Sequence, residues 1–131
     1  MRFRTWVGII AIVTLASEGL ILSANTLHPA CPHGERIRMP PPFLFNGGHA
    51  YVADLPDLER LADSGDAASS PLVVCENDRL MGPAHSPHHE ITESGGGRFS
   101  HWGAELLFSA SDNSDPNTNG RSYQAIRTDR P

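Results

Sequence analysis

The chain has 131 residues, with 10 Lys and Arg against 15 Asp and Glu and a formal net charge of −5. This length suits one domain. From Asn25 onward, 8 Arg stand against 14 Asp and Glu, which gives that part a charge of −6. Such a charge repels phosphate backbones, so we expect no nucleic-acid partner.

Residues 1–24 have the layout of a signal peptide or a membrane anchor. Arg2 and Arg4 precede an uncharged apolar run over 6–16, and the positive end is expected to stay inside while the rest crosses. Cleavage after Gly19 fits the small residues there, whereas an uncleaved hydrophobic helix over the same region is just long enough to span a membrane. Both interpretations place the remainder outside the cytoplasm, either periplasmic or secreted, or anchored to the membrane by one N-terminal helix. The third alternative is that the segment is a buried helix of a soluble protein.

Both cysteines, Cys31 and Cys75, follow the apolar segment. In an exported protein they can pair, and a disulfide closing a loop of this length contributes up to roughly 4 kcal/mol in the chain-entropy model. The alternative is a pair of separate buried thiols, because Cys31 lies in a Pro-rich region.

Residues 25–42 contain five prolines and no apolar periodicity, which predicts an extended Pro-rich spacer. Residues 43–127 form the predicted small β-rich domain, and 128–131 form a tail. Extended segments are expected over 43–45 and 49–53, on either side of a turn at Asn46-Gly-Gly.

One or two helical turns are expected over 57–63, where two leucines lie three residues apart. The apolar run 71–76 predicts a strand, with Asn77-Asp78 as a hairpin turn into 79–81. A further strand is expected over 123–126. The fold class is therefore mainly β: a small antiparallel sheet or sandwich with one short helix, preceded by the N-terminal hydrophobic helix.

The segment 105–110 alternates in a way typical of a strand. Leu106, Phe108 and Ala110 fall on one face, while Leu107 falls on the other. We expect the first three residues to share one environment and Leu107 to lie in a different one.

A histidine-rich segment offers candidate metal ligands. His85, His88 and His89 lie close together in the sequence, and imidazole groups bind zinc and similar ions. The spacing matches no established metal motif, however, and Pro87 argues against a helix presenting two histidines on one face. The alternative is that these histidines make structural hydrogen bonds or face solvent.

The segment 115–120 reads Asp-Pro-Asn-Thr-Asn-Gly, which fits the first half of a calcium loop. Its candidate ligands are Asp115, Asn117 and Asn119. Ile126 occupies the position of the expected bidentate Glu, so a rigid hydrogen-bonded loop is the competing interpretation. Calcium and zinc are thus the two cofactors that the sequence suggests, neither of them established.

No nucleophile stands out in the sequence. Ser100 adjoins His101, but neighbouring residues on a strand point to opposite faces, which prevents a direct bond between these two side chains. Whether the protein is an enzyme stays open.

Four segments carry a resemblance: Ser70-Pro-Leu, Gly82-Pro-Ala-His followed by His88 and Glu90-Ile, Gly97-Arg-Phe-Ser-His-Trp, and the run over 108–121. On these, the chain from about 42 to 123 resembles a small β-rich domain of bacterial polysaccharide and glycan-modification proteins. That domain is often attached to or near glycosyltransferase or sugar-methyltransferase regions. The resemblance implies a glycan or polysaccharide partner but no particular reaction.

The leading hypothesis is a non-catalytic, extracytoplasmic glycan-associated accessory or binding domain. Two alternatives are kept: a metal-dependent hydrolase or transferase using the histidine cluster, and a structural envelope protein without intrinsic activity. The predicted ligand-binding residues combine aromatic and polar side chains and are Arg98, His101, Trp102, Asp112, Asp115 and Asn119.

Overall fold

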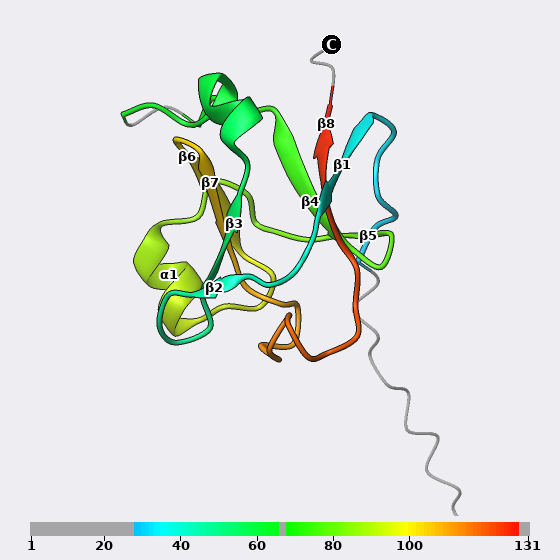
Figure 1. The fold of residues 1–131 in the computed structure, drawn as a ribbon, viewed down its shortest axis with the longest axis vertical. Helices are drawn as coiled ribbons and strands as arrows, with labels where there is room; N and C mark the ends of the chain where they lie inside the picture. Colours follow the sequence, from blue (N-terminus) through cyan, green and yellow to red (C-terminus); the bar gives the residue numbers. More distant parts are fainter. Residues whose placement is uncertain (1–27, 66–67, 129–131) are drawn as a thin grey trace, which may run out of the picture.

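The computed structural model describes residues 28–65 and 68–128, and within them the chain forms two four-stranded antiparallel sheets (Figure 1). The mainly β prediction is confirmed. The hydrophobic helix expected over 1–24 and the last three residues of the predicted tail lie outside the described residues.

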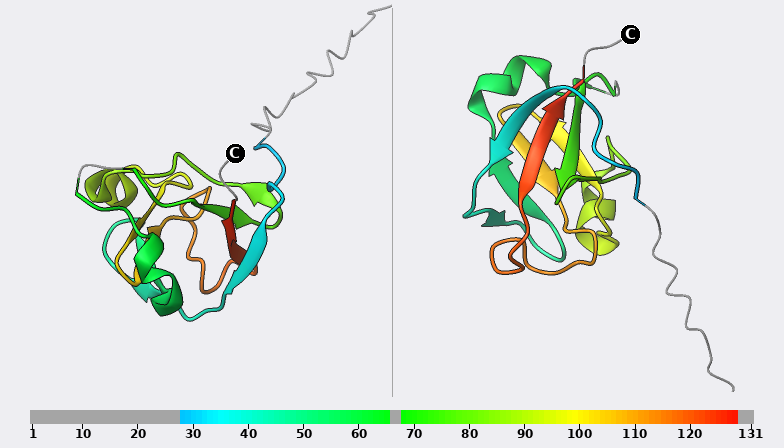
Figure 2. Two further views of the ribbon diagram at one scale, coloured as in Figure 1. Left: turned by 90° about the horizontal axis from the view of Figure 1, so that it is seen from above. Right: turned by 90° about the vertical axis from the view of Figure 1, so that its right-hand side faces the viewer.

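The first sheet has the strand order β1-β8-β4-β5 and brings the two ends of the domain together. Its strands are β1 (Glu35–Met39), β8 (Tyr123–Arg127), β4 (Leu72–Glu76) and β5 (Arg79–Leu80). The last strand in the chain, β8, lies between β1 and β4 and pairs with both along its whole length (Figure 2, right).

The second sheet has the order β2-β3-β7-β6. Its strands are β2 (Leu44–Phe45), β3 (Tyr51–Asp54), β7 (Glu105–Phe108) and β6 (Phe99–Trp102). Two short helices lie in the connections, the 3-10 helix η1 (Pro56–Leu61) and α1 (His88–Glu93). The helical turns predicted over 57–63 correspond to η1.

One apolar core lies between the sheets, because its buried residues come from strands of both. Val74, Tyr123 and Ala125 enter it from the first sheet, and Leu106 and Phe108 enter it from the second. Aromatic packing is direct, since the Phe108 and Tyr123 rings have centroids 5.2 Å apart. This burial of apolar surface is the main stabilising contribution to the sandwich.

The predicted alternation along β7 is confirmed. Leu106, Phe108 and Ala110 all belong to the core between the sheets. Leu107 faces the other way and packs with Ile91 of α1 in a second apolar cluster. The helix α1 therefore covers the outer face of the second sheet, which explains why both faces of β7 are apolar.

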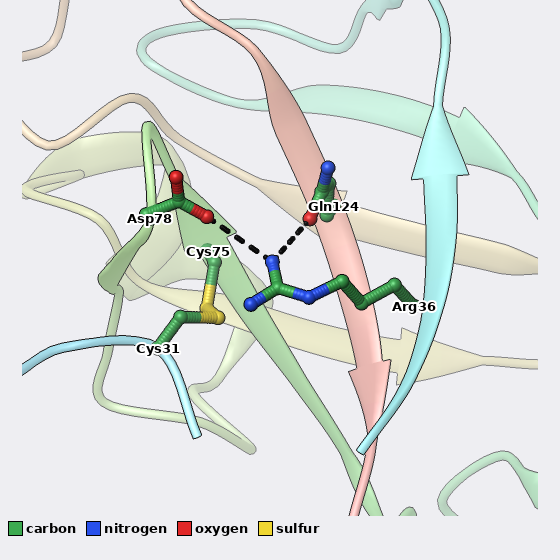
Figure 3. Close-up of a disulfide and its surroundings, with 5 residues drawn as sticks. All are labelled: Cys31, Arg36, Cys75, Asp78 and Gln124. Carbon is green, nitrogen blue, oxygen red and sulfur yellow. Dashed lines mark hydrogen bonds and ion pairs between the residues drawn. A yellow bond between two sulfur atoms is a disulfide. The ribbon is translucent and has the colours of Figure 1, made fainter. Parts of the chain in front are cut away.

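A disulfide joins Cys31 to Cys75 (Figure 3), so the two cysteines pair and are not separate buried thiols. It attaches the segment before β1 to the buried strand β4. Beside it, Arg36 Nη1 donates to Asp78 Oδ1 at 3.1 Å and to Gln124 Oε1 at 2.8 Å, which connects β1 to the β4–β5 turn and to β8.

The disulfide indicates an oxidising, extracytoplasmic environment, because such bonds persist where thiols are not kept reduced. Within residues 28–65 and 68–128, no helix combines the length and apolar character needed to cross a bilayer.

The prediction of an extended Pro-rich spacer over 25–42 is wrong for Glu35–Met39, which form the strand β1. Ile37 and Met39 turn toward the core while Arg36 and Arg38 are exposed, which is the period-two pattern of an edge strand. The prolines on either side favoured the spacer prediction over this short alternation. Strand β1 is stabilised by its long-range pairing with β8.

Pro87, which argued against a helix presenting two histidines on one face, directly precedes a short helix. Helix α1 begins at His88, immediately after Pro87, whose own carbonyl accepts from the backbone N–H groups of Glu90 and Ile91. A proline at the start of a helix costs little, because the first helical N–H groups have no partner within the helix.

Candidate functional site

A surface cleft of about 460 Å³ lies beside α1, and we call it the Asp63 cleft. Its walls come from the segment after η1, the loop before α1, the first residue of α1 and the last residue of β6. The lining residues are Asp63, Gly65, Ala68, His85, Ser86, Pro87, His88 and Trp102. Its volume is within the ordinary range for small-ligand sites.

Asp63 is the buried carboxylate of the cleft, with 8% of its surface exposed. Its position is fixed by the backbone, since the N–H groups of Ser69 and Ser70 each donate to Oδ1 at 2.8 Å. Burial raises the pKa of the Asp63 carboxyl, but the hydrogen bonds from His85, Ser70 and Ser69 outweigh it and leave the pKa below its ordinary value. Asp63 is therefore ionised at neutral pH.

His85 forms a pair with Asp63. Its Nδ1 lies 2.9 Å from Oδ2 and 3.0 Å from Oδ1. An ionised carboxylate only accepts hydrogen bonds, so Nδ1 carries a proton and, in the neutral ring, Nε2 is the basic nitrogen. The His85 side chain keeps 31% of its surface exposed, so this pair lies partly buried at the wall of the cleft.

The backbone of His85 adopts φ +55°. Non-glycine residues rarely occupy this left-handed region, and holding one there costs of the order of 1 kcal/mol or more. Asn77 and Asp78, which share the conformation, are the two turn residues of the β4–β5 hairpin, where left-handed angles are required. His85 is in no such hairpin, and its conformation brings the ring to Asp63.

His101 lies behind the cleft rather than in it. The side chain is 2% exposed, and Nδ1 lies 2.8 Å from the Ser70 hydroxyl oxygen. Its backbone carbonyl accepts from the N–H of Asp63 at 2.9 Å. Burial lowers the pKa of His101 and the nearby Asp63 carboxylate offsets this only in part, so His101 is neutral at pH 7. It supports Asp63 from behind and is not among the residues that line the cleft.

Trp102 forms the aromatic wall of the Asp63 cleft. It ends β6 and keeps 42% of its surface exposed. The His88 ring packs against it edge to face, with centroids 5.7 Å apart and an interplanar angle of 89°. An exposed indole therefore lies next to a fixed carboxylate–imidazole pair.

The six predicted ligand-binding residues are not gathered in one place. Trp102 pairs with Glu105 at one end of the β6–β7 ladder, and Phe99 pairs with Phe108 at the other. The loop from β7 to β8, orange in Figure 1, leaves from the Phe108 end. The loop's own candidates, Asp112, Asp115 and Asn119, are thus separated from Trp102 by the length of the strands. Arg98, just before Phe99, donates from Nη1 to the Gly95 carbonyl and does not line the cleft.

The predicted calcium ligands are engaged within the fold. Asn117 accepts from Phe43 N–H at 2.7 Å and donates to Phe43 C=O at 3.0 Å, while Asn119 donates to the Tyr123 hydroxyl at 2.8 Å. Asp115 Oδ1 accepts from the Asn117 backbone. These side chains point to different partners, which supports the rigid hydrogen-bonded loop.

The same loop is held by a charged network that the sequence did not suggest. Arg121 donates to Asp112 from Nη1 at 2.8 Å and from Nη2 at 2.6 Å, and Nη1 also donates to buried Glu76 at 2.7 Å. Burial raises the pKa of Glu76, and hydrogen bonds from Ser111, Arg121 and Tyr123 bring it below the ordinary value. Asp112 is accordingly a structural residue of this loop.

The three predicted metal-binding histidines also have separate environments. His85 bonds Asp63, His88 packs on Trp102, and His89 is exposed on α1. Within the described parts of the chain, no group of three or more His, Cys, Asp or Glu side chains is arranged to hold a metal ion.

Sequence reasoning missed Asp63 and Ser70. The sequence pattern predicts a helical turn at Asp63, and only Ser70-Pro-Leu, one of the resembling segments, points to this region. Their proximity to His85 and His101 depends on how the η1–β4 segment crosses the end of β6, where Asp63 bridges to Trp102.

No family model, curated protein or solved structure matches this chain at a significant level. Function must therefore be argued from the cleft. Its side chains provide an aromatic ring, a fixed anion and an imidazole whose Nε2 has no hydrogen-bond partner among the residues that the structure describes. Such a set can hold a neutral polar ligand that has both apolar and hydroxyl-bearing faces, and it can accept a proton.

Proposed function

We propose that the protein is an extracytoplasmic, glycan-associated binding domain whose ligand occupies the Asp63 cleft. The observation that carries the proposal is the partly exposed Trp102 side chain beside the Asp63–His85 pair. Sugar rings present C–H faces that pack on an indole and hydroxyl groups that bond to imidazole nitrogens, so this combination matches their chemistry.

The location of the domain supports the same proposal. Its disulfide fits a compartment where extracellular and envelope polysaccharides occur. The four segments that resemble bacterial glycan-modification proteins include Ser70, His85, His88 and Trp102, which either line the Asp63 cleft or support it. The signal or anchor segment expected over 1–24 would deliver the domain there as a periplasmic, secreted or membrane-anchored protein.

Glycan-array screening followed by calorimetric titration with the best ligand tests the proposal. Trp102→Ala should weaken binding at least tenfold, because it removes the aromatic wall. The matched control is Phe45→Ala, which deletes another exposed aromatic side chain, on β2 of the same sheet and outside the Asp63 cleft.

Absence of binding on the array, or equal affinities for the wild type and Trp102→Ala, would contradict the proposal. Loss of binding in Asp115→Ala with normal binding in Trp102→Ala would instead place the ligand at the β7–β8 loop. Circular dichroism of each variant checks that the sandwich is retained.

A further inference from the structure

We propose that the Asp63 cleft is also catalytic, with His85 as the general base for hydrolysis of acyl esters carried by a sugar. The proposed glycan partner supplies the substrate class, so this part rests on the proposed function. The catalytic step itself rests on the geometry of Asp63 and His85.

The first support is that the base is oriented and available. Asp63 is immobilised by two backbone N–H groups and accepts from His85 Nδ1 through both oxygens. That leaves Nε2 as the basic nitrogen, and within the described part of the chain it has no hydrogen-bond partner. A carboxylate that fixes the tautomer of a partly exposed imidazole is the arrangement that makes histidine an effective general base.

The second support is the position of the backbone strain. His85 holds a left-handed conformation that favours glycine or asparagine, and it does so outside any hairpin turn. The turn formed by Ala84 and His85 holds this conformation, and the ring that it carries is the one that pairs with Asp63. Strain of this kind collects at sites where one side-chain placement is needed for function.

The composition of the cleft selects the reaction class. Glycosidic cleavage requires two carboxyl groups, one of them protonated. Among the lining residues that the structure describes, Asp63 is the one carboxylate, and it is fully engaged with His85 and the backbone. A single imidazole can serve ester hydrolysis, first as base and then as acid.

The steps balance with water as the only co-reactant. As the water oxygen bonds to the acyl carbon, its proton moves to Nε2 of His85, and the carbonyl π electrons move to oxygen. The tetrahedral intermediate then collapses, the bond between the acyl carbon and the sugar oxygen breaks, and the imidazolium returns its proton to that oxygen. The products are a carboxylic acid and a free sugar hydroxyl.

Other residues of the cleft have positioning roles. Trp102 would hold the sugar ring, and His88, which packs against Trp102 and lines the cleft, would donate a ring N–H to the carbonyl oxygen. Asp63 acts through His85 and is itself a positioning residue.

The test measures acetate release by proton NMR from O-acetylated xylo-, manno- and gluco-oligosaccharides, together with hydrolysis of 4-nitrophenyl acetate. His85→Asn should lower the rate by 10²-fold or more, in line with general-base contributions. Asparagine tolerates the left-handed backbone, so this variant is expected to fold. His89→Asn is the matched control, an exposed histidine on α1 outside the cleft, and should keep the wild-type rate.

A second variant separates chemistry from folding. His85→Gly suits the backbone at φ +55°, and it leaves a space that free imidazole can enter. Added imidazole should raise the hydrolysis rate of His85→Gly by a factor at least ten times larger than the factor by which it raises the rate of His89→Asn. A purely structural role for His85 would give no such rescue.

The outcomes distinguish this proposal from glycan binding. Glycan binding without acetate release, or a His85→Asn rate equal to that of the wild type on every ester, overturns the catalytic assignment and leaves the binding domain. Hydrolysis of 4-nitrophenyl acetate that depends on His85, with no glycan bound, supports the catalytic site and overturns the glycan partner.

Discussion

Replacing Arg121 with alanine should be among the most damaging single changes to a partly exposed side chain in this protein. Arg121 is the cation shared by Glu76 and Asp112. Its removal leaves Glu76, whose side chain is only 5% exposed, as a buried carboxylate that retains hydrogen bonds from the Tyr123 hydroxyl at 3.0 Å and Ser111 N–H at 3.2 Å.

The magnitude follows from that burial. Breaking a buried ion pair costs about 3–5 kcal/mol, and we expect about 3 kcal/mol for Arg121→Ala because two neutral donors to Glu76 remain. Asp112→Ala removes a partner that is half exposed, so its cost should be about 1 kcal/mol.

Urea unfolding at pH 7 with the disulfide intact measures both costs from the transition midpoints and slopes. The variant that combines Arg121→Ala with Glu76→Gln provides the control, since it removes the stranded charge. Its cost should fall below the sum of the two single costs by about 1 kcal/mol or more. A cost below 1 kcal/mol for Arg121→Ala, or one equal to that of Asp112→Ala, would refute the reasoning that Glu76 depends on Arg121.

Three further predictions test other parts of the fold. Replacing both Cys31 and Cys75 with alanine should lower the free energy of unfolding by up to about 4 kcal/mol, measured by thermal and urea unfolding against the oxidised wild type. The folded-state pKa of Glu76 is depressed, so its contribution is present above the unfolded pKa and is lost as pH falls through the folded pKa. The stability gap between wild type and Glu76→Gln should therefore shrink in acid, and a gap that widens in urea titrations below pH 4 would contradict this. Phe108→Ala should cost about 3–5 kcal/mol because that ring is fully buried in the core, whereas Phe45→Ala, at an exposed site, should cost well under half as much by calorimetry.

Local patterns in the sequence predicted much of the fold. The alternation over 105–110 correctly divided Leu107 from its neighbours, and Asn77-Asp78 correctly marked the β4–β5 turn, because side-chain direction in a strand and left-handed turn angles are properties of adjacent residues. The same approach failed at β1, where five residues between prolines depend on distant β8 for pairing.

The candidate site was predicted only in part. Trp102 and His85 were identified from their side-chain chemistry, and both line the cleft. The prediction placed the polar side chains of the loop over 111–120 in one site with Trp102, but its acids and amides bond within the loop and to neighbouring strands. The edge-to-face contact of Trp102 with His88 and the Asp63–His85 bond join residues 14 and 22 positions apart, and no spacing rule connects them.

By itself, the sequence determined a mainly β domain with strands at particular places, because strand and turn preferences act between neighbours along the chain. Only the tertiary structure decided that Cys31 reaches Cys75, that Arg121 lies between Glu76 and Asp112, and that Asp63 faces His85. These contacts depend on how two sheets pack and where their connections cross. Core packing, which acts between distant segments, sets that arrangement.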